Sequence, residues 1–255
     1  MSEKKLLIYV VAYKATMHIR SVLEQIPYAD YKNHEVLVSD DASGDETSQM
    51  VQKFMQENPE KNIKLVTQEI NLGYGGNQKF GYDYAIKNGF DVVVLIHGDG
   101  QYSPTLIPRI VNPIMEDKVD VMLGSRMMEK KLALKGGMPM YKFIGNIVLT
   151  KAQNLLLGMK LAEYHTGLRA FSVASLARIP FKENNNGFSF DTDILIQLID
   201  NKVRIGEVGI PTYYGDEICR VNGMKYAFEI MLATVLSRAQ RLGIYKCKKF
   251  DYKNV

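Results

Sequence analysis

Apolar residues along the chain fall into two alternating patterns. Short runs of β-branched and other apolar residues predict buried strands at residues 6–11, 36–38, 63–66, 92–96 and 119–123. Between these runs apolar residues recur at helical spacing, as at Ile19, Val22 and Leu23 before Pro27. Alternating strands and helices predict an α/β fold with a mostly parallel central sheet and helices on both faces.

Polar residues mark where several of these helices are expected to begin. Ser43 and Glu46 have the spacing of a capping box. The glycine-rich segment 71–76 opens a further helix, and Ser103 with Pro104 suits the N-cap and first position of another. The side chains expected to face inward from the first and last of these helices are Met50, Val51, Phe54, Met55, Leu106, Ile107, Ile110, Val111 and Ile114.

The alternation loosens after residue 126. We expect a mobile loop at 135–139, a helix at 141–157, a short strand at 168–171, a helix after Asp191 and a strand at 203–208. A last helix at 224–242 is expected to turn five side chains inward, namely Tyr226, Ile230, Met231, Thr234 and Val235. We interpret residues 1–223 as the main domain and 224–255 as a C-terminal amphipathic helix and basic tail of the same unit.

Polar residues follow three of the predicted strands directly. These are Asp40 and Asp41, then His97 to Asp99, then Ser125 and Arg126. Parallel strands end at one edge of a sheet, where ligands of open α/β sheets bind, so we expect these residues to share one rim. Asp99 is the first candidate for chemistry there, although an aspartate after a strand also commonly caps a helix or forms a turn.

Composition narrows the classes of partner. The net charge of +4 is small and scattered, which argues against nucleic acid and leaves an anionic ligand or the inner leaflet of a membrane open. The two cysteines, Cys219 and Cys247, match no metal spacing and no disulfide framework. No run of eighteen apolar residues predicts a membrane span, and we expect a cytoplasmic protein.

Other nucleotide-binding and hydrolytic classes fit the residues poorly. Gly73 and Gly75 begin a dinucleotide fingerprint, but Gln78 stands where its last glycine belongs. Gly76 and Gly81 have phosphate-loop spacing, yet Tyr82 and Asp83 replace the lysine and hydroxyl residue that the loop requires. His97 has no serine or cysteine nucleophile motif nearby. A dehydrogenase, an ATPase and a triad hydrolase are therefore disfavoured.

Several motifs, taken in order, resemble inverting glycosyltransferases of family two. They are Ala12-Tyr13, Val38-Ser39-Asp40-Asp41-Ala42-Ser43-x-Asp45-x-Thr47, Asn71-x-Gly73, His97-Gly98-Asp99-Gly100-Gln101, Gly124-Ser125-Arg126 and Thr166-Gly167-x-Arg169-Ala170-Phe171. The resemblance spans about residues 6–225 and is closest to the branch that contains dolichyl-phosphate mannose synthases. It implies the GT-A fold and a nucleotide-diphosphate sugar, a GDP- or UDP-hexose, as donor.

The resemblance also implies roles for individual residues on the donor side. Ala12 and Tyr13 would line the base pocket, and Asp40 or Asp41 would hold the base or ribose, with Gly73 and Gly98 also at the donor site. Asp99 would bind Mg²⁺ or Mn²⁺, because a hard cation on oxygen ligands stabilises the departing diphosphate. Arg126, Arg220 and Lys225 would hold phosphate.

His97 departs from the family pattern, which has an aspartate at this position. A histidine ligates transition metals but suits Mg²⁺ poorly. Either His97 ligates Mn²⁺, or it hydrogen-bonds near the metal without touching it, and we favour the second hypothesis. Lys14 and Ala15 replace the usual asparagine and glutamate after Tyr13. These departures affect the choice of metal and the base contacts.

The acceptor side centres on Asp191. A sugar acceptor needs a general base, and Asp191 stands where related enzymes carry an acidic residue. A polyprenyl phosphate needs none, because its oxygen is already ionised, and Asp191 would then orient the donor sugar or bind acceptor groups. A helix cap is the structural alternative for Asp191, as a surface ion pair is for Arg126.

These observations lead to one main hypothesis and two alternatives. We expect a metal-dependent inverting glycosyltransferase that moves a hexose to a polyprenyl phosphate, dolichyl or undecaprenyl. The alternatives are transfer to a cell-surface glycan or other saccharide, and a non-catalytic nucleotide-sugar-binding protein. We interpret the helix face at 231–236 as part of the core or as a homodimer contact, in preference to a membrane anchor. The terminal lysines leave peripheral contact with the inner membrane face open.

Overall fold

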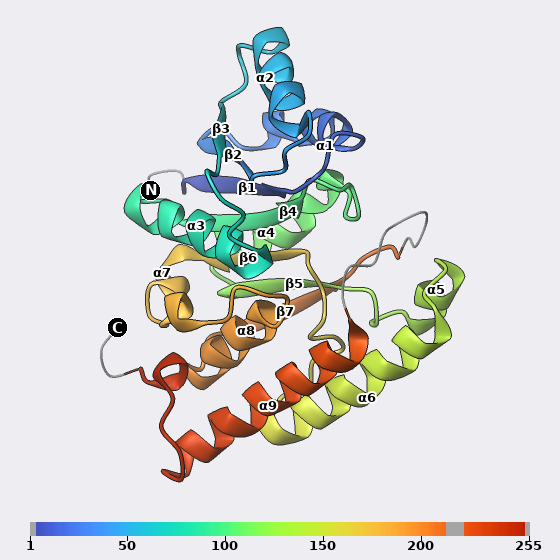
Figure 1. Cartoon of the computed structure of the whole chain (residues 1–255), viewed down its shortest axis with the longest axis vertical. Helices are drawn as coiled ribbons and strands as arrows, with labels where there is room; N and C mark the ends of the chain where they lie inside the picture. Colours follow the sequence, from blue (N-terminus) through green and yellow to red (C-terminus); the bar gives the residue numbers. More distant parts are fainter. Residues whose placement is uncertain (1–3, 213–221, 253–255) are drawn as a thin grey trace.

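A computed structural model describes residues 4–212 and 222–252, which form a seven-stranded sheet in the order β3-β2-β1-β4-β6-β5-β7 (Figure 1). Among these strands β6 alone runs antiparallel to its neighbours. The predicted mostly parallel α/β sheet is therefore confirmed. The strands are β1 (Leu6–Ala12), β2 (His34–Asp40), β3 (Ile63–Thr67), β4 (Val92–His97), β5 (Val121–Ser125), β6 (Arg169–Ser172) and β7 (Ile205–Gly209).

Helices connect the strands and cover both faces of the sheet (Figure 1). They are α1 (Ile19–Glu24), α2 (Thr47–Glu57), α3 (Tyr74–Lys87), α4 (Ile107–Met115), α5 (Lys130–Lys135), α6 (Met140–Leu157), α7 (Val173–Leu176), α8 (Phe190–Asp200) and α9 (Gly223–Arg241). Short 3₁₀ turns are η1 (Tyr28–Asp30), η2 (Pro104–Leu106), η3 (Phe181–Glu183) and η4 (Lys248–Phe250).

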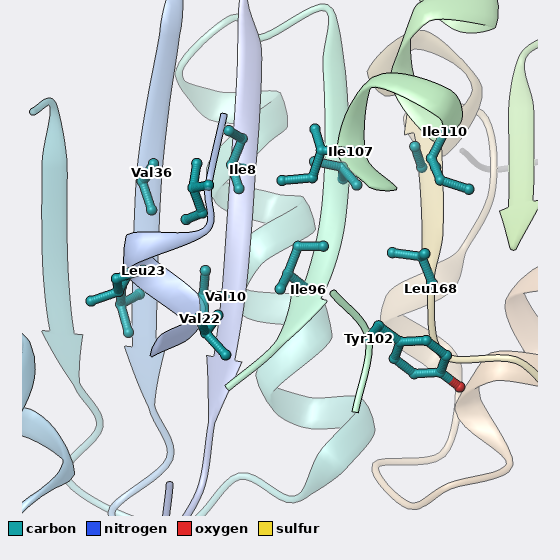
Figure 2. Close-up of a cluster of buried hydrophobic side chains, with 14 of the residues drawn as sticks. Ile8, Val10, Val22, Leu23, Val36, Ile96, Tyr102, Ile107, Ile110 and Leu168 are labelled. Atoms are coloured by element: carbon teal, nitrogen blue, oxygen red, sulfur yellow. The ribbon is translucent and has the colours of Figure 1, made fainter. Parts of the chain in front are cut away.

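Alternate residues of the central strands supply two separate cores. In β1, Ile8 and Val10 point to a cluster that includes side chains of α1, α2 and α4, whereas Leu7 and Tyr9 point to a cluster with α3, α7 and α8. Figure 2 shows the first cluster. Burial on both faces explains why these strands are continuous apolar runs and not alternating ones.

A third layer lies beyond α8. Every residue of 190–199 is buried, because α8 packs between the sheet and α9, and α6 in turn packs along α9 (Figure 1). Within the described residues, none of the helices combines the length and the apolar character needed to cross a membrane. The division at residue 223 stays a prediction.

Two local predictions were wrong, and one helix was not predicted. Ser43 does not cap α2, whose N-cap is Glu46 without a side-chain hydrogen bond, because Ser43 is bonded to Asp40 instead. Residues 130–135 form α5, a helix that was not predicted, and the expected loop lies at 136–139 between α5 and α6. Val235 on α9 is exposed, because the inner face of α9 is made by Ile230, Ala233, Thr234 and Ser237.

Candidate active site

The carboxyl ends of β1, β2, β4 and β5 lie along one edge of the sheet. Ala12 is level with Asp40, and Val11 is level with His97. β5 runs in the same direction as β4, because both are antiparallel to β6 between them. The prediction that the polar strand ends share a rim is thus confirmed.

Asp40 is buried within its own loop. One carboxylate oxygen accepts hydrogen bonds from the backbone N–H (3.2 Å) and hydroxyl of Ser43, and the other accepts from the Ser48 hydroxyl at 2.6 Å. Ser43 Oγ in turn accepts from the N–H of Lys14 at 2.8 Å. Asp40 therefore ties the end of β2 to the turn after β1.

Asp41 joins the same rim to the glycine-rich loop. Its two carboxylate oxygens accept from the N–H groups of Leu72 at 2.7 Å and Gly73 at 3.1 Å, and its carbonyl accepts from the Asn71 amide at 3.0 Å. Burial raises the pKa of Asp41, while the two backbone donors oppose this rise. A base or ribose contact by Asp40 or Asp41 remains a prediction.

The glycine-rich loop allows two chain segments to approach closely. Gly73 has φ +79°, and a Cβ there would lie 2.9 Å from the carbonyl oxygen of Asn186. A Cβ on Gly75 would lie 2.6 Å from the carbonyl oxygen of Asn185, and the Gly75 N–H donates to Asn186 at 2.7 Å. These glycines hold the segment before α8 against the start of α3.

Asp99 is the exposed carboxylate of the rim. Its Oδ1 accepts from the backbone N–H of Gln101 at 3.0 Å, and no hydrogen bond joins Oδ2 to the described residues. The preceding Gly98 is buried and donates to the carbonyl of Val11 at 2.8 Å, which fixes the strand end. Asp99 is thus directed by the backbone and open to solvent.

The donor set at Asp99 fits a divalent cation that is shared with a ligand. Within the described residues no three His, Cys, Asp or Glu side chains are grouped so that they could hold a metal by themselves. Mg²⁺ is usually held by one or two carboxylates together with substrate phosphates, so one exposed carboxylate suffices when a diphosphate supplies further oxygens. Metal binding by Asp99 remains a prediction.

His97 packs against aromatic rings. Its ring meets those of Tyr74 and Tyr102 edge to face, with centroids 5.7 Å and 5.5 Å apart. Its Nε2 lies 3.5 Å from the Tyr74 hydroxyl, and a Cβ at Gly167 would lie 2.6 Å from its Cε1. The surroundings of His97 are those of a packed ring that fixes the rim, and its place beside a metal remains a prediction.

Asp191 lies in the first turn of α8, whose N-cap is Ser189, and is held by several side chains. Oδ2 accepts from the Tyr74 hydroxyl at 2.8 Å and lies 3.4 Å from a guanidinium nitrogen of Arg169, while Oδ1 accepts from the Gln78 amide at 3.1 Å. Arg169 also donates to the Asp191 carbonyl at 2.7 Å. Tyr74 therefore connects His97 on the rim to Asp191.

Arg126 forms a buried ion pair, so the surface-pair alternative was wrong. Its guanidinium bonds Glu163 and the carbonyl of His165, and Glu163 also accepts from the Arg126 N–H at 2.7 Å. Burial, together with the charges of Arg169 and Arg126, lowers the pKa of His165 to about 3. Phosphate binding by Arg126 would have to occur beside this pair and remains a prediction.

The remaining predicted residues differ in exposure. Ala12 is buried and Tyr13 is exposed. Lys225 lies in the first turn of α9, where its N–H donates to the N-cap Asn222 at 3.1 Å and its Nζ lies 3.9 Å from Glu229. Arg220 lies outside the described residues. The roles predicted for these four residues are not tested by the fold.

Three side chains that organise this region were not singled out from the sequence, namely Tyr74, Gln78 and Glu163. Each contacts a residue that was singled out, but across long stretches of chain. Of the three, only Glu163 could have been found from the sequence. No other acidic residue stands between Glu129 and Glu163, and an arginine that is buried requires an acidic partner.

Beside β7 the rim also borders a cavity of about 390 Å³, lined in part by Arg109, Glu129 and Lys135.

Solved structures share this fold. Glucosyl-3-phosphoglycerate synthase from Mycobacterium tuberculosis, solved with Mn²⁺, UDP and phosphoglyceric acid, superposes with a TM-score of 0.67 at 18% identity, covering 95% of this chain and 80% of that one. The sheet and its rim thus define the GT-A fold of glycosyltransferases.

The family follows from the sequence match. The model of glycosyl transferase family 2 matches residues 17–179, and the chain belongs to this family. The chain is 28% identical to the UDP-N-acetylglucosamine–dolichyl-phosphate N-acetylglucosaminyltransferase of Methanococcus voltae, over 90% of this chain and 94% of that protein. It is 23% identical to the polyprenol monophosphomannose synthase of Mycolicibacterium smegmatis, over 81% of this chain and 77% of that protein. The predicted branch, which contains the dolichyl-phosphate mannose synthases, is thereby supported.

Proposed function

We propose that this glycosyltransferase moves a hexose, with inversion, from a nucleotide-diphosphate sugar to a polyprenyl phosphate. The observation that carries the proposal is the exposed carboxylate of Asp99 on a rim where Asp40 and Asp41 are already bonded to the protein. Relatives named for dolichyl-phosphate and polyprenol transfer, which match most of this chain, support the acceptor class.

The chemistry requires little covalent participation by the protein. An ionised phosphate oxygen of the acceptor attacks the anomeric carbon, and the bond from that carbon to the diphosphate oxygen breaks. A divalent cation at Asp99 would neutralise the negative charge that develops on the leaving diphosphate. Asp99 would hold the cation and the donor in place, so positioning and electrostatics account for catalysis.

The surroundings of Asp191 favour the lipid phosphate over a saccharide acceptor. A general base must lie within hydrogen-bond reach of the acceptor hydroxyl whose proton it takes, whereas Asp191 is only 7% exposed. Both carboxylate oxygens of Asp191 already accept hydrogen bonds, from Tyr74 and Gln78, and Arg169 lies beside one of them. Asp191 is better suited to position Tyr74 and His97, and a phosphate acceptor needs no base.

A donor and acceptor panel tests the proposal. The full chain is incubated with UDP-N-acetylglucosamine, UDP-glucose or GDP-mannose, Mg²⁺ or Mn²⁺, and undecaprenyl phosphate in detergent. We expect one donor to yield a lipid-extractable sugar phosphate whose anomeric configuration, measured by NMR, is opposite to that of the donor. Transfer only to free saccharides, or binding of UDP or GDP sugars without turnover, would overturn the proposal in favour of one of the two alternatives.

A further inference from the structure

Two adjacent helices carry exposed apolar side chains on the side away from the core. On α6 four of them are spaced by three, four and seven residues, which places them along one face of the helix, and a fifth is adjacent to the first of these four. They are Met140, Tyr141, Ile144, Val148 and Leu155. Leu155 is 84% exposed, so no packing within the described chain accounts for it.

The neighbouring helix α9 has the same property. Its exposed apolar residues are Met224, Phe228, Leu232 and Val235, again spaced by three or four, and Leu242 follows at the end of the helix. Figure 1 shows α6 and α9 side by side, and the Gln153 amide donates to the Thr234 hydroxyl between them at 3.3 Å. We call these residues of α6 and α9 the α6–α9 face.

Positive charge borders the α6–α9 face. The stretch 130–162, which includes α5 and α6, contains lysines and no aspartate or glutamate. Its lysines are Lys130, Lys131, Lys135, Lys142, Lys151 and Lys160. Apolar side chains bordered by lysines are typical of helices that lie in the interfacial layer of a membrane.

The α6–α9 face is also connected to the rim. Asn146 on α6 donates to Glu163 at 2.8 Å, and Glu163 pairs with Arg126 at the end of β5. The hydroxyl of Tyr226 on α9 lies 3.0 Å from Nδ1 of His165, whose carbonyl accepts from Arg126. Residues in the first two turns of both helices thus contact the residues that hold the rim.

We propose that the α6–α9 face docks on an anionic lipid bilayer, with both helices lying in its interfacial layer. A second copy of the chain fits less well. A two-fold dimer would set the same face against itself and bring the lysines of 130–160 together, whereas anionic lipid complements their charge. Under the proposed function, this placement also brings the acceptor phosphate at the bilayer surface toward the rim.

Vesicle sedimentation tests the proposal without any substrate. The full chain should bind vesicles that contain phosphatidylglycerol and bind pure phosphatidylcholine vesicles far more weakly. Ile144→Ser combined with Phe228→Ser should lower the partition coefficient about tenfold or more. Lys130→Gln and Lys131→Gln should each lower it about fivefold. Because all four residues are exposed, the variants are expected to keep the fold, which circular dichroism checks.

Matched controls lie on other surfaces. Ile70→Ser removes an apolar side chain that is 70% exposed, close to the 69% of Phe228, and Lys53→Gln removes an exposed lysine of α2. Neither should alter vesicle binding. Equal losses in the control and test variants, or binding that ignores lipid charge, would overturn the proposal. The proposal would also be overturned if the variant with Ile144→Ser and Phe228→Ser bound vesicles normally but had a different oligomeric state, measured by light scattering. The α6–α9 face would then be a contact between copies of the chain.

Failure of this proposal can be told apart from failure of the proposed function. Transfer to a short-chain isoprenyl phosphate that dissolves in detergent requires no bilayer. If the full chain transfers sugar to this acceptor but does not bind phosphatidylglycerol vesicles, the docking proposal fails alone. If it binds the vesicles through the α6–α9 face but transfers sugar to no polyprenyl phosphate, the proposed function fails alone.

Discussion

Asp99 follows His97 by two positions, and Asp191 is bonded to Tyr74, which packs on His97, yet the surroundings of the two aspartates are opposite. Asp99 is exposed and accepts one backbone hydrogen bond, from Gln101. Asp191 is buried and is held by three side chains. An exposed carboxylate can bind a ligand at little cost, whereas a buried one in an ion pair mainly fixes its neighbours. The comparison separates the residue that we propose to act on the donor from one that positions its neighbours.

Replacing Asp99 should have the largest effect on activity. We expect Asp99→Asn to lower kcat/KM for the donor by about 100-fold or more, because under the proposed function it removes a charge that would act on the leaving diphosphate. The melting temperature without ligand should not change, since Asp99 is exposed. Asp30→Asn, an exposed aspartate in η1 near the opposite edge of the sheet, is the control. Full activity of Asp99→Asn would contradict the distinction between Asp99 and Asp191.

Replacing Asp191 should reduce stability. Asp191→Asn leaves Arg169 buried without its counter-charge, and we expect the free energy of unfolding to fall by about 3 kcal/mol. Urea denaturation measures this change. Asp83→Asn, which breaks more exposed pairs with Lys87 and Lys182, should cost less than about 1 kcal/mol. Unchanged stability of Asp191→Asn, with loss of the acidic limb of the pH–rate profile, would identify Asp191 as a general base.

His165 should make the fold sensitive to mild acid. Its pKa is lowered from 6.5 to about 3 by burial, so between these values the unfolded chain binds a proton that the folded chain does not. The contribution of His165 to the free energy of unfolding is fully present above pH 6.5 and is lost as the pH falls toward 3. At pH 5 the loss amounts to about 2 kcal/mol. His165→Gln should lose less stability between pH 7 and pH 5, measured by urea denaturation. His18→Gln, at an exposed position, should lose as much stability between pH 7 and pH 5 as the unsubstituted chain. An equal loss in all three proteins would contradict the role of His165.

Removing the Tyr74 hydroxyl should have the smallest effect. Tyr74→Phe loses the hydrogen bond to Asp191 and should lower the free energy of unfolding by about 1–2 kcal/mol. Combined with Asp191→Asn, its effect should be less than additive, because both changes remove the same contact. Tyr245→Phe, at an exposed position, is the control. Strict additivity would show that the Tyr74 hydroxyl does not act through Asp191.

Much of the fold could be predicted because the hydrophobic pattern specifies it directly. Strands such as β4 are buried on both faces and appear as unbroken apolar runs, and parallel order then places their polar ends on one rim. The pattern failed where burial is slight. In α5 only Ala133 is buried, so this helix leaves almost no periodic signal.

The roles of the residues on the rim were harder to predict from the sequence than the position of the rim. The sequence indicated Asp40, Asp41, Asp99 and Asp191 alike as polar groups near strand or helix ends. It contained no sign that Asp40 is bonded to Ser48 or that Asp191 is bonded to Tyr74, 117 positions away. Burial and hydrogen-bond partners depend on tertiary packing, and these features distinguish a ligand-binding carboxylate from a structural one.

The reversed direction of β6 decides where the chain tolerates added sequence. Because β6 is antiparallel to β4 and β5, the segment that leads into it, with Thr166 and Gly167, enters at the functional rim, whereas the turn at Asp117 lies at the other edge of the sheet. A peptide inserted beside the exposed Asp117 would project away from the rim. The same peptide before β6 would disturb the rim at Gly167, where the ring of His97 leaves no room even for a Cβ. Labels and fusion partners therefore belong at the edge that contains Asp117.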